Sequence, residues 1–353
     1  SWGELQTPNK ACPFKSMNFL NRYRKIPRSI LLMISAAFLI HMINAGFILI
    51  LNIYLRKKGY ADESIAQFNS FRFLGVLFFA FPLGIFIKGK ALKPFFLASS
   101  LLVPLFSLFL LLSIQGGNET RITLGFILWG ISFMILNVCG LPYIMRSAPE
   151  EVVSEAISLN FSTWSLATIV SGSLINILSR VKEIVIGGVL IPLDEYHIML
   201  VIISISSLSF ILVLFIKEAK PRSVSSSFFN NLRALGSEYD WKLIGRVLVP
   251  NMLIAIGAGL TIPFVNLFFN TVFEVDSDTF SLIGAGTAGI VFMTTLIVPI
   301  IRRKFGFRVA ILIPQWLAIL FLVILATTQL AQAYSWAFYV AIAAFMLRQP
   351  FMN

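Results

Sequence analysis

The sequence has few charged residues, few cysteines and few histidines for its length. Only 12% of its 353 residues are charged, about half of the roughly 25% usual in soluble domains, while 58% are hydrophobic. Two cysteines, Cys12 and Cys139, make neither a disulfide framework nor a metal site, and two histidines cannot form the clusters that many enzymes use. With a mean hydropathy of +0.86, these shortages exclude a cytosolic enzyme or a nucleic-acid binder and indicate a protein of the lipid bilayer.

Carboxylates are missing from the middle of every hydrophobic run. All sixteen acidic residues fall in loops or at the ends of the runs. Because ionisable groups at membrane depth are costly and usually functional, a proton-coupled carrier would need another titratable group. His41 is one candidate, and Asp62 and Glu63 at the edge of the second run are others, while sodium coupling or uniport stays open.

About ten hydrophobic segments are long enough to span a ~30 Å hydrocarbon core, which takes about 20 helical residues. We place them at 29–55, 65–87, 94–114, 122–145, 153–179, 197–216, 243–272, 279–301, 308–330 and 334–353. These segments predict an all-α, polytopic bundle of membrane helices. The last segment stops at Asn353 without a polar flank, so we expect the chain to stop short of a longer protein's end.

The distribution of Lys and Arg predicts the orientation of these spans. With the amino terminus in the cytoplasm, the inner segments hold twenty basic residues and the outer loops hold six. Such an excess marks the cytoplasmic side. We therefore expect a multi-pass protein of the plasma membrane, in bacteria the inner membrane, with a cytoplasmic amino terminus.

The longest polar stretch, residues 217–242, divides the spans into two sets. We expect a tail at 1–28, a six-helix bundle at 29–216, a cytoplasmic linker at 217–242 and a partial second bundle at 243–353. This layout is typical of transporters built from two parallel repeats. Short basic loops occupy the same place in both halves, at residues 84–93 and 299–308.

These two loops carry a resemblance to the major facilitator superfamily of secondary transporters. The family's loop signature is Gly, three residues, Asp, a basic residue, any residue, Gly and two basic residues. Gly84 and Lys93 fit the first copy, and Lys304, Gly306 and Arg308 fit the second. Lys88 and Arg303 stand where the family has Asp. The resemblance implies twelve spans in the full protein, two of them missing here, with cytoplasmic gating at these loops.

Polar side chains within the spans are the candidates for a solute site. His41 lies about 18 Å into the first span at 1.5 Å per residue, and Asn44 shares its face. A structural role for His41, as a hydrogen-bond donor to a neighbouring helix, is nearly as well supported. The seventh span contains Gly259, Pro263 and Asn266, which together predict a bend that exposes carbonyl groups to a cavity.

Arg72 and Arg348 are the other charges within the spans, and no buried acid is available to pair with them. Each must face water, a helix carbonyl end or an anionic substrate. Arg72 lies one and a half to two turns below the outer face and could snorkel, whereas Arg348 could instead pack against missing helices. The remaining candidates for substrate binding are amides and one tryptophan: Asn137, Asn160, Trp164, Asn251, Asn266 and Gln315. For each amide alone, an interhelical hydrogen bond is the simpler reading.

The leading function is a carrier that moves a small solute by alternating access around a midplane site. A lipid or amphiphile flippase on the same scaffold is the alternative, and a non-transporting receptor or membrane enzyme is a third. We expect no cofactor, no metal and no nucleic-acid partner. The expected partners are a small-molecule solute, membrane lipids and a coupling ion, proton or sodium, that the sequence leaves open. We expect a monomer.

Overall fold

The computed structural model describes residues 22–181, 183–186, 189–218, 240–261, 265–275 and 277–352, which are almost all helical. The helices are α2 (Arg28–Lys57), α3 (Asp62–Phe86), α4 (Lys93–Gln115), α5 (Glu119–Ser147), α6 (Val153–Val181), α7 (Glu195–Ser207), α8 (Ser209–Leu214), α10 (Trp241–Thr261), α11 (Val265–Phe273), α12 (Ser277–Thr327), the 3-10 helix η2 (Thr328–Ala331) and α13 (Ser335–Met352). Two short strands, β1 (Glu183–Ile186) and β2 (Val189–Pro192), pair antiparallel in the loop before α7. The predicted all-α membrane bundle is confirmed, with this hairpin as a small addition.

Eight described segments are long and apolar enough to cross a membrane. They are Arg28–Lys57, Glu63–Phe86, Lys93–Gln115, Glu119–Ser147, Val153–Val181, Glu195–Leu214, Ile283–Gly306 and Arg308–Ala331. Each coincides with a predicted span. The other two predicted spans contain α10 with α11, and α13. Residues 262–264, where the bend was predicted, lie outside the described residues, as do residues 219–239 of the expected linker.

Local chemistry explains several helix ends. The Asn118 side chain accepts a hydrogen bond from the Arg121 backbone N–H at 3.0 Å and so caps α5. Asp194 caps α7 in the same way through the His197 N–H, also at 3.0 Å. Gly306 adopts φ 80° and ψ 171°, which breaks α12 into its two spans. The predicted short loop of residues 299–308 is therefore a single sharp break in a helix.

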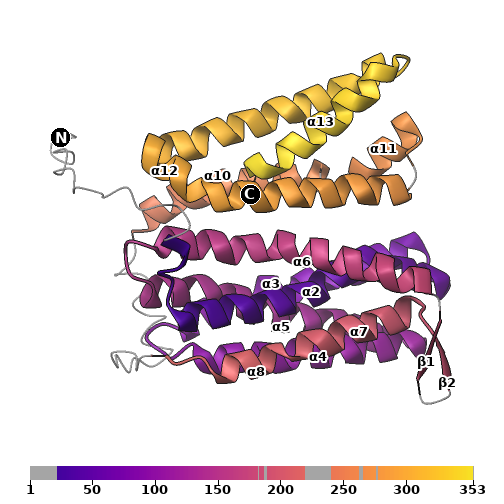
Figure 1. Cartoon of the computed structure of the whole chain (residues 1–353), viewed down its shortest axis with the longest axis horizontal. Coiled ribbons are helices and arrows are strands. Elements are labelled where there is room, and N and C mark those ends of the chain that lie inside the picture. The colour runs from indigo at the N-terminus through magenta and orange to yellow at the C-terminus, as the bar shows by residue number, and fades with distance from the viewer. Residues whose placement is uncertain are drawn as a thin grey trace.

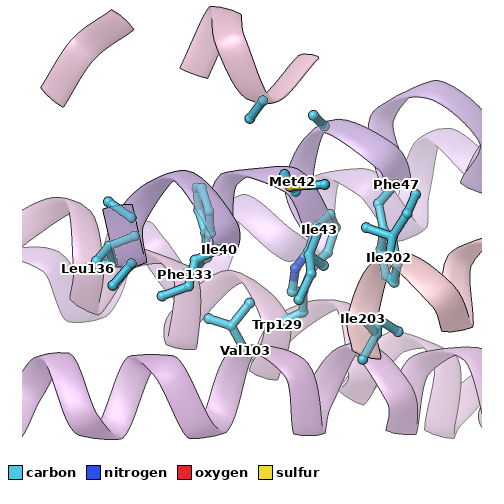
Figure 2. Packing of buried hydrophobic residues seen from close by; sticks show 14 of the residues in the cluster. Ile40, Met42, Ile43, Phe47, Val103, Trp129, Phe133, Leu136, Ile202 and Ile203 are labelled. Atoms are coloured by element: carbon cyan, nitrogen blue, oxygen red, sulfur yellow. The ribbon is translucent and has the colours of Figure 1, made fainter. Parts of the chain in front are cut away.

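Helices α2 to α8 surround one buried hydrophobic cluster, in which α2 is central. Ile40, Ile43 and Phe47 of α2 are at most 1% exposed. Figure 2 shows Trp129 of α5 between Ile43 and Val103 in this core. His41 and Asn44 of α2 are 6% and 1% exposed, so these two polar residues face protein rather than lipid.

A second, smaller cluster joins α11, α12 and α13 around Phe269 and Phe345. In Figure 1, α10 to α13 lie on one side of the molecule and α2 to α8 on the other. Helices α6 and α12 face each other across the boundary and are in contact. Polar groups on α6 are thus placed beside the junction of the two sets of helices.

Candidate solute site and membrane-face contacts

The crossing of α3 and α5 depends on two glycines. A Cβ atom at Gly130 would lie 2.2 Å from the backbone oxygen of Arg72, and one at Gly75 would lie 2.7 Å from the Ile131 side chain. Such distances are incompatible with any larger residue unless the helices move apart. The glycines therefore allow the close approach that brings Arg72 against α5.

Arg72 lies over the face of Trp129 and next to Asn44. Its guanidinium carbon is 4.1 Å from the centre of the Trp129 ring, a cation–π contact, and its Nη2 donates to Asn44 Oδ1. Only 8% of Arg72 is exposed. The side chain is thus held inside the bundle between α2 and α5.

The contacts of Arg72 bear on whether it snorkels. The helix begins at Asp62, so Arg72 is ten residues, about 15 Å, from the start of α3. The side chain does not snorkel, because its contacts with Trp129 and Asn44 hold it at this depth.

His41 contacts α6 through Thr163. Thr163 Oγ1 donates to the Asn160 carbonyl oxygen at 2.6 Å and lies 2.9 Å from His41 Nδ1. The other ring nitrogen, Nε2, is buried.

Aromatic rings connect the histidine to the arginine. The His41 ring centre is 5.6 Å from that of Phe133 and 5.4 Å from that of Trp164. Phe133 is also 5.8 Å from the Arg72 guanidinium carbon. Asn137, one turn along α5, interacts with the His41 side chain. We call His41, Asn44, Arg72, Asn137 and Trp164 the polar cluster.

The polar cluster joins α2, α3, α5 and α6 and has a buried and an exposed part. His41, Asn44 and Arg72 are buried, whereas Asn137 is exposed and Trp164 is 43% exposed. A solute approaching the cluster would meet Trp164 and Asn137 first. Among the described residues, no group of three or more His, Cys, Asp or Glu is arranged to hold a metal.

The structure brings five of the ten predicted site residues together, and a sixth is close. Asn160 contributes its backbone carbonyl to the hydrogen-bond chain through Thr163. Three others lie on the other set of helices: Asn251, exposed on α10, Gln315, exposed on α12, and Arg348, buried on α13. The side chain of Asn266 lies outside the described residues. Sequence reasoning did not place Trp129 and Phe133 in the site, because only the helix crossing shows what each touches.

The basic loop at residues 84–93 is held in place by the carboxylate of Glu218, which follows α8. Glu218 accepts from the backbone N–H groups of Leu92 and Lys93 at 2.8 to 2.9 Å and caps α4. The Lys93 ammonium donates in turn to the Leu214 carbonyl at the end of α8, at 2.8 Å. Lys88 thus occupies the signature's acidic position, while Glu218 supplies a carboxylate to the same loop.

The other basic loop, residues 299–308, contacts α6 through an ion pair between a partly exposed arginine and a buried carboxylate. Arg303 Nη2 lies 2.5 Å and 2.7 Å from the two carboxylate oxygens of Glu155, which is 2% exposed. The same Nη2 donates to the Glu151 carbonyl at 2.9 Å, and Arg22 approaches Glu155 at 3.7 Å. Sequence reasoning counted Glu155 as a span-end acid and missed this role.

Tyr23 adds a second tie between the two sets of helices. Its hydroxyl donates to the Leu296 carbonyl of α12 at 2.9 Å. Burial, and then the nearby Glu155 carboxylate, raise the pKa of Tyr23 to about 12, so the phenol keeps the proton that it donates. Both ties lie near the start of α2. Of the remaining predicted gating residues, Gly84 and Arg308 are exposed.

A cavity of about 260 Å³ lies at the end of the bundle where α2 begins, away from the polar cluster. Its lining residues come from the start of α2 and the end of α8: Arg28, Ser29, Leu32, Phe215 and Lys217. No residue of the polar cluster lines it. We therefore treat the polar cluster, and not this cavity, as the candidate solute site.

Comparisons with known proteins bear on sequence and fold separately. The family model of the Major Facilitator Superfamily matches residues 2–172. No curated protein sequence matches the chain. Among solved structures, a D-xylose-proton symporter is similar over 92% of this chain and 79% of its own, with a TM-score of 0.59 and 15% identity. The superfamily transporter FucP, in its outward conformation, is similar over 92% and 82%, with a TM-score of 0.60 and 17% identity.

A third structure extends the likeness to nearly the whole chain. It is a bacterial homolog of the human lysosomal transporter Spinster, in an inward-facing conformation, and the match covers 96% of this chain and 74% of that one. The TM-score is 0.60 and the identity 13%, a level at which likeness shows the fold alone. The family match over the amino-terminal half and the shared fold over most of the chain agree with the resemblance of the loops. Residues 2–172 thus match the family model of the Major Facilitator Superfamily, and most of the chain shares the fold of solved transporters of that superfamily.

Proposed function

We propose that this protein is a secondary transporter of the Major Facilitator Superfamily and binds a small solute at the polar cluster. The observation that carries the proposal is the convergence of polar side chains from α2, α3, α5 and α6 at membrane depth, where such groups are costly unless they serve a function. Trp164 and Asn137 are the exposed entry to the cluster. The solute reaches them when the two sets of helices rock apart.

We further propose that transport is coupled to protons through His41. The described spans place no carboxylate in the polar cluster, and His41 is the group there whose ordinary titration range is near neutral pH. Protonation would make both of its ring nitrogens donors and change what the cluster can bind. The D-xylose and fucose relatives of this fold are named as proton symporters, which is compatible with this coupling.

The proposal includes the organisation predicted from the sequence. We place the amino terminus in the cytoplasm, from the excess of basic residues on that side. Residues 29–216 and 243–353 form the two rocking units, joined by the linker at 217–242. The Glu155–Arg303 and Tyr23–Leu296 contacts tie these units at the cytoplasmic face and act as a gate.

The test measures uptake of a ¹³C-labelled metabolite extract into proteoliposomes, with and without an inward proton gradient. We expect wild type to accumulate at least one solute when the gradient is applied. His41→Gln should lower this accumulation at least tenfold and retain solute exchange without a gradient. His197→Gln changes the other histidine, which pairs with Asp194 at the start of α7, and should accumulate within twofold of wild type.

Two results would contradict the proposal at different points. Gradient-driven accumulation in His41→Gln equal to wild type would remove the coupling role of His41 and leave transport intact. Failure of wild type to take up any labelled solute, in either orientation of the gradient, would contradict transport itself.

A further inference from the structure

Arg72 carries a positive charge that nothing nearby in the described helices neutralises. Its partners are a neutral amide, Asn44, and the ring faces of Trp129, Phe133 and Phe73. The acids nearest to it along α3, Asp62 and Glu63, lie at the start of that helix, nine or ten residues away. A buried cation without a counter-charge is strongly unfavourable in a bilayer. The missing negative charge is therefore a property that a ligand could supply.

The free hydrogen-bonding groups around Arg72 are donors. Asn44 uses its oxygen to accept from Arg72, and its Nδ2 is buried with no partner in the described part of the chain. Nη2 is the only guanidinium nitrogen of Arg72 with a hydrogen bond to a described residue, which leaves further N–H groups. A site of unsatisfied donors and net positive charge is complementary to an anion with several acceptor oxygens.

We infer that the solute is an organic anion whose carboxylate is bound by Arg72 and the Asn44 amide; this inference depends on the proposed transport function. The guanidinium is oriented by its stacking on Trp129, so a planar carboxylate meets a preformed fork of donors. The aromatic rings of Phe133 and Trp164 offer an apolar wall for the rest of the solute. His41 takes up the proton that accompanies the anion.

A structural role for Arg72 makes a different prediction, and one substitution separates the two. Asn44→Asp would place a carboxylate against the guanidinium and neutralise the charge within the protein. A structural arginine would be held as firmly or more firmly, and solute binding would not change. An arginine that binds the solute would lose its site to the internal carboxylate.

The experiment uses the full chain in proteoliposomes and a defined set of probes. The probes are the monocarboxylate pyruvate, the dicarboxylate succinate, the neutral sugars D-xylose and L-fucose, and the cation choline. We expect wild type to take up a carboxylate and not the sugars or choline. Asn44→Asp and Arg72→Gln should raise the carboxylate concentration that gives half-maximal uptake at least tenfold.

The matched control is Asn52→Asp on the same helix. Asn52 is two turns further along α2, where its side chain accepts a hydrogen bond from the Asn69 amide at 3.0 Å and is exposed. This variant adds the same charge to α2 outside the polar cluster, and we expect half-saturation within twofold of wild type. The unfolding temperature of each purified variant separates loss of the site from loss of the fold.

The outcomes are distinguishable. Uptake of a sugar or of choline, with unchanged half-saturation in Arg72→Gln, would overturn the anion class and leave the proposed transport function standing. Carboxylate uptake that is unaffected by Asn44→Asp would also overturn the inference. Uptake of no probe by wild type, together with uptake of no solute from the labelled extract, would overturn both.

Discussion

Single atoms at the crossing of α3 and α5 decide whether Arg72 can reach its partners. The missing side chain of Gly130 leaves room for the backbone oxygen of Arg72. A methyl group there would push α3 away and remove the guanidinium from Trp129. The glycine thus acts on the polar cluster through packing, without any contact of its own to the guanidinium of Arg72.

We expect Gly130→Ala to destabilise the protein by about 1–3 kcal/mol, as overpacking does in tightly packed interiors. The unfolding temperature in detergent would measure it. Gly140→Ala is the control, because it lies on the same helix and a Cβ there meets nothing within 4 Å. Equal unfolding temperatures for the two variants would show that the α3–α5 crossing is not the constraint described.

At the residue scale, the sequence identified the polar residues of the cluster, but it did not predict which side chains they contact. His41, Asn44 and Arg72 stand out because polar groups are rare in the spans. That Asn44 would bind Arg72 while His41 would bind Thr163 depends on how four helices meet. Trp129 has no signal of its own, because an aromatic residue in a span is normally packing or lipid contact.

At the scale of elements, the first turn of α4 is completed by a residue from the far end of the same set of helices. Glu218 follows α8 by four residues and satisfies two backbone N–H groups before and at the start of α4. A carboxylate there also interacts favourably with the positive end of the helix dipole. The end of α8 and the loop before α4 are thereby fixed to each other.

We expect Glu218→Ala to destabilise the protein by about 1–2 kcal/mol, the usual cost of losing an N-cap. Hydrogen–deuterium exchange should rise at least several-fold in a peptide covering residues 90–97 and stay unchanged in α5. Glu150→Ala removes an exposed carboxylate with no partner among the described residues and serves as the control. Unchanged exchange at 90–97 in Glu218→Ala would contradict the capping role.

The spans themselves were predictable, because hydropathy over about 20 residues determines where a helix can lie in lipid. The eight segments that qualify match predicted ones. The ends were less predictable, because they depend on local groups such as the Asn118 cap or the positive φ of Gly306. The β1–β2 hairpin was missed, since four-residue strands leave a weak pattern between two long hydrophobic runs.

At the scale of the whole molecule, one buried carboxylate connects the two sets of helices. Glu155 belongs to α6, and Arg303 belongs to α12. Hydrogen bonds to charged groups contribute about 1.5–3 kcal/mol each. Separation of α6 from α12 at this end requires breaking them, so the pair favours the state in which this end is closed.

We expect Glu155→Gln to shift the protein toward states in which this end is open. Spin labels at Glu150→Cys and Phe305→Cys, both exposed positions, would report the distance by double electron–electron resonance in a background without native cysteines. Long distances should become at least several-fold more populated. Glu151→Gln is the control, because Glu151 contributes only its backbone carbonyl to Arg303. An identical distance distribution in both variants would contradict the gating role.

The polar cluster draws all of its side chains from α2, α3, α5 and α6, which belong to one set of helices. A solute held only by these groups keeps the same contacts whichever membrane face the cluster is open to. Its intrinsic dissociation constant is then equal on the two sides. The affinity of the cluster then favours neither side, and the gradients of solute and coupling ion set the direction of net flux, as they do in any secondary transporter.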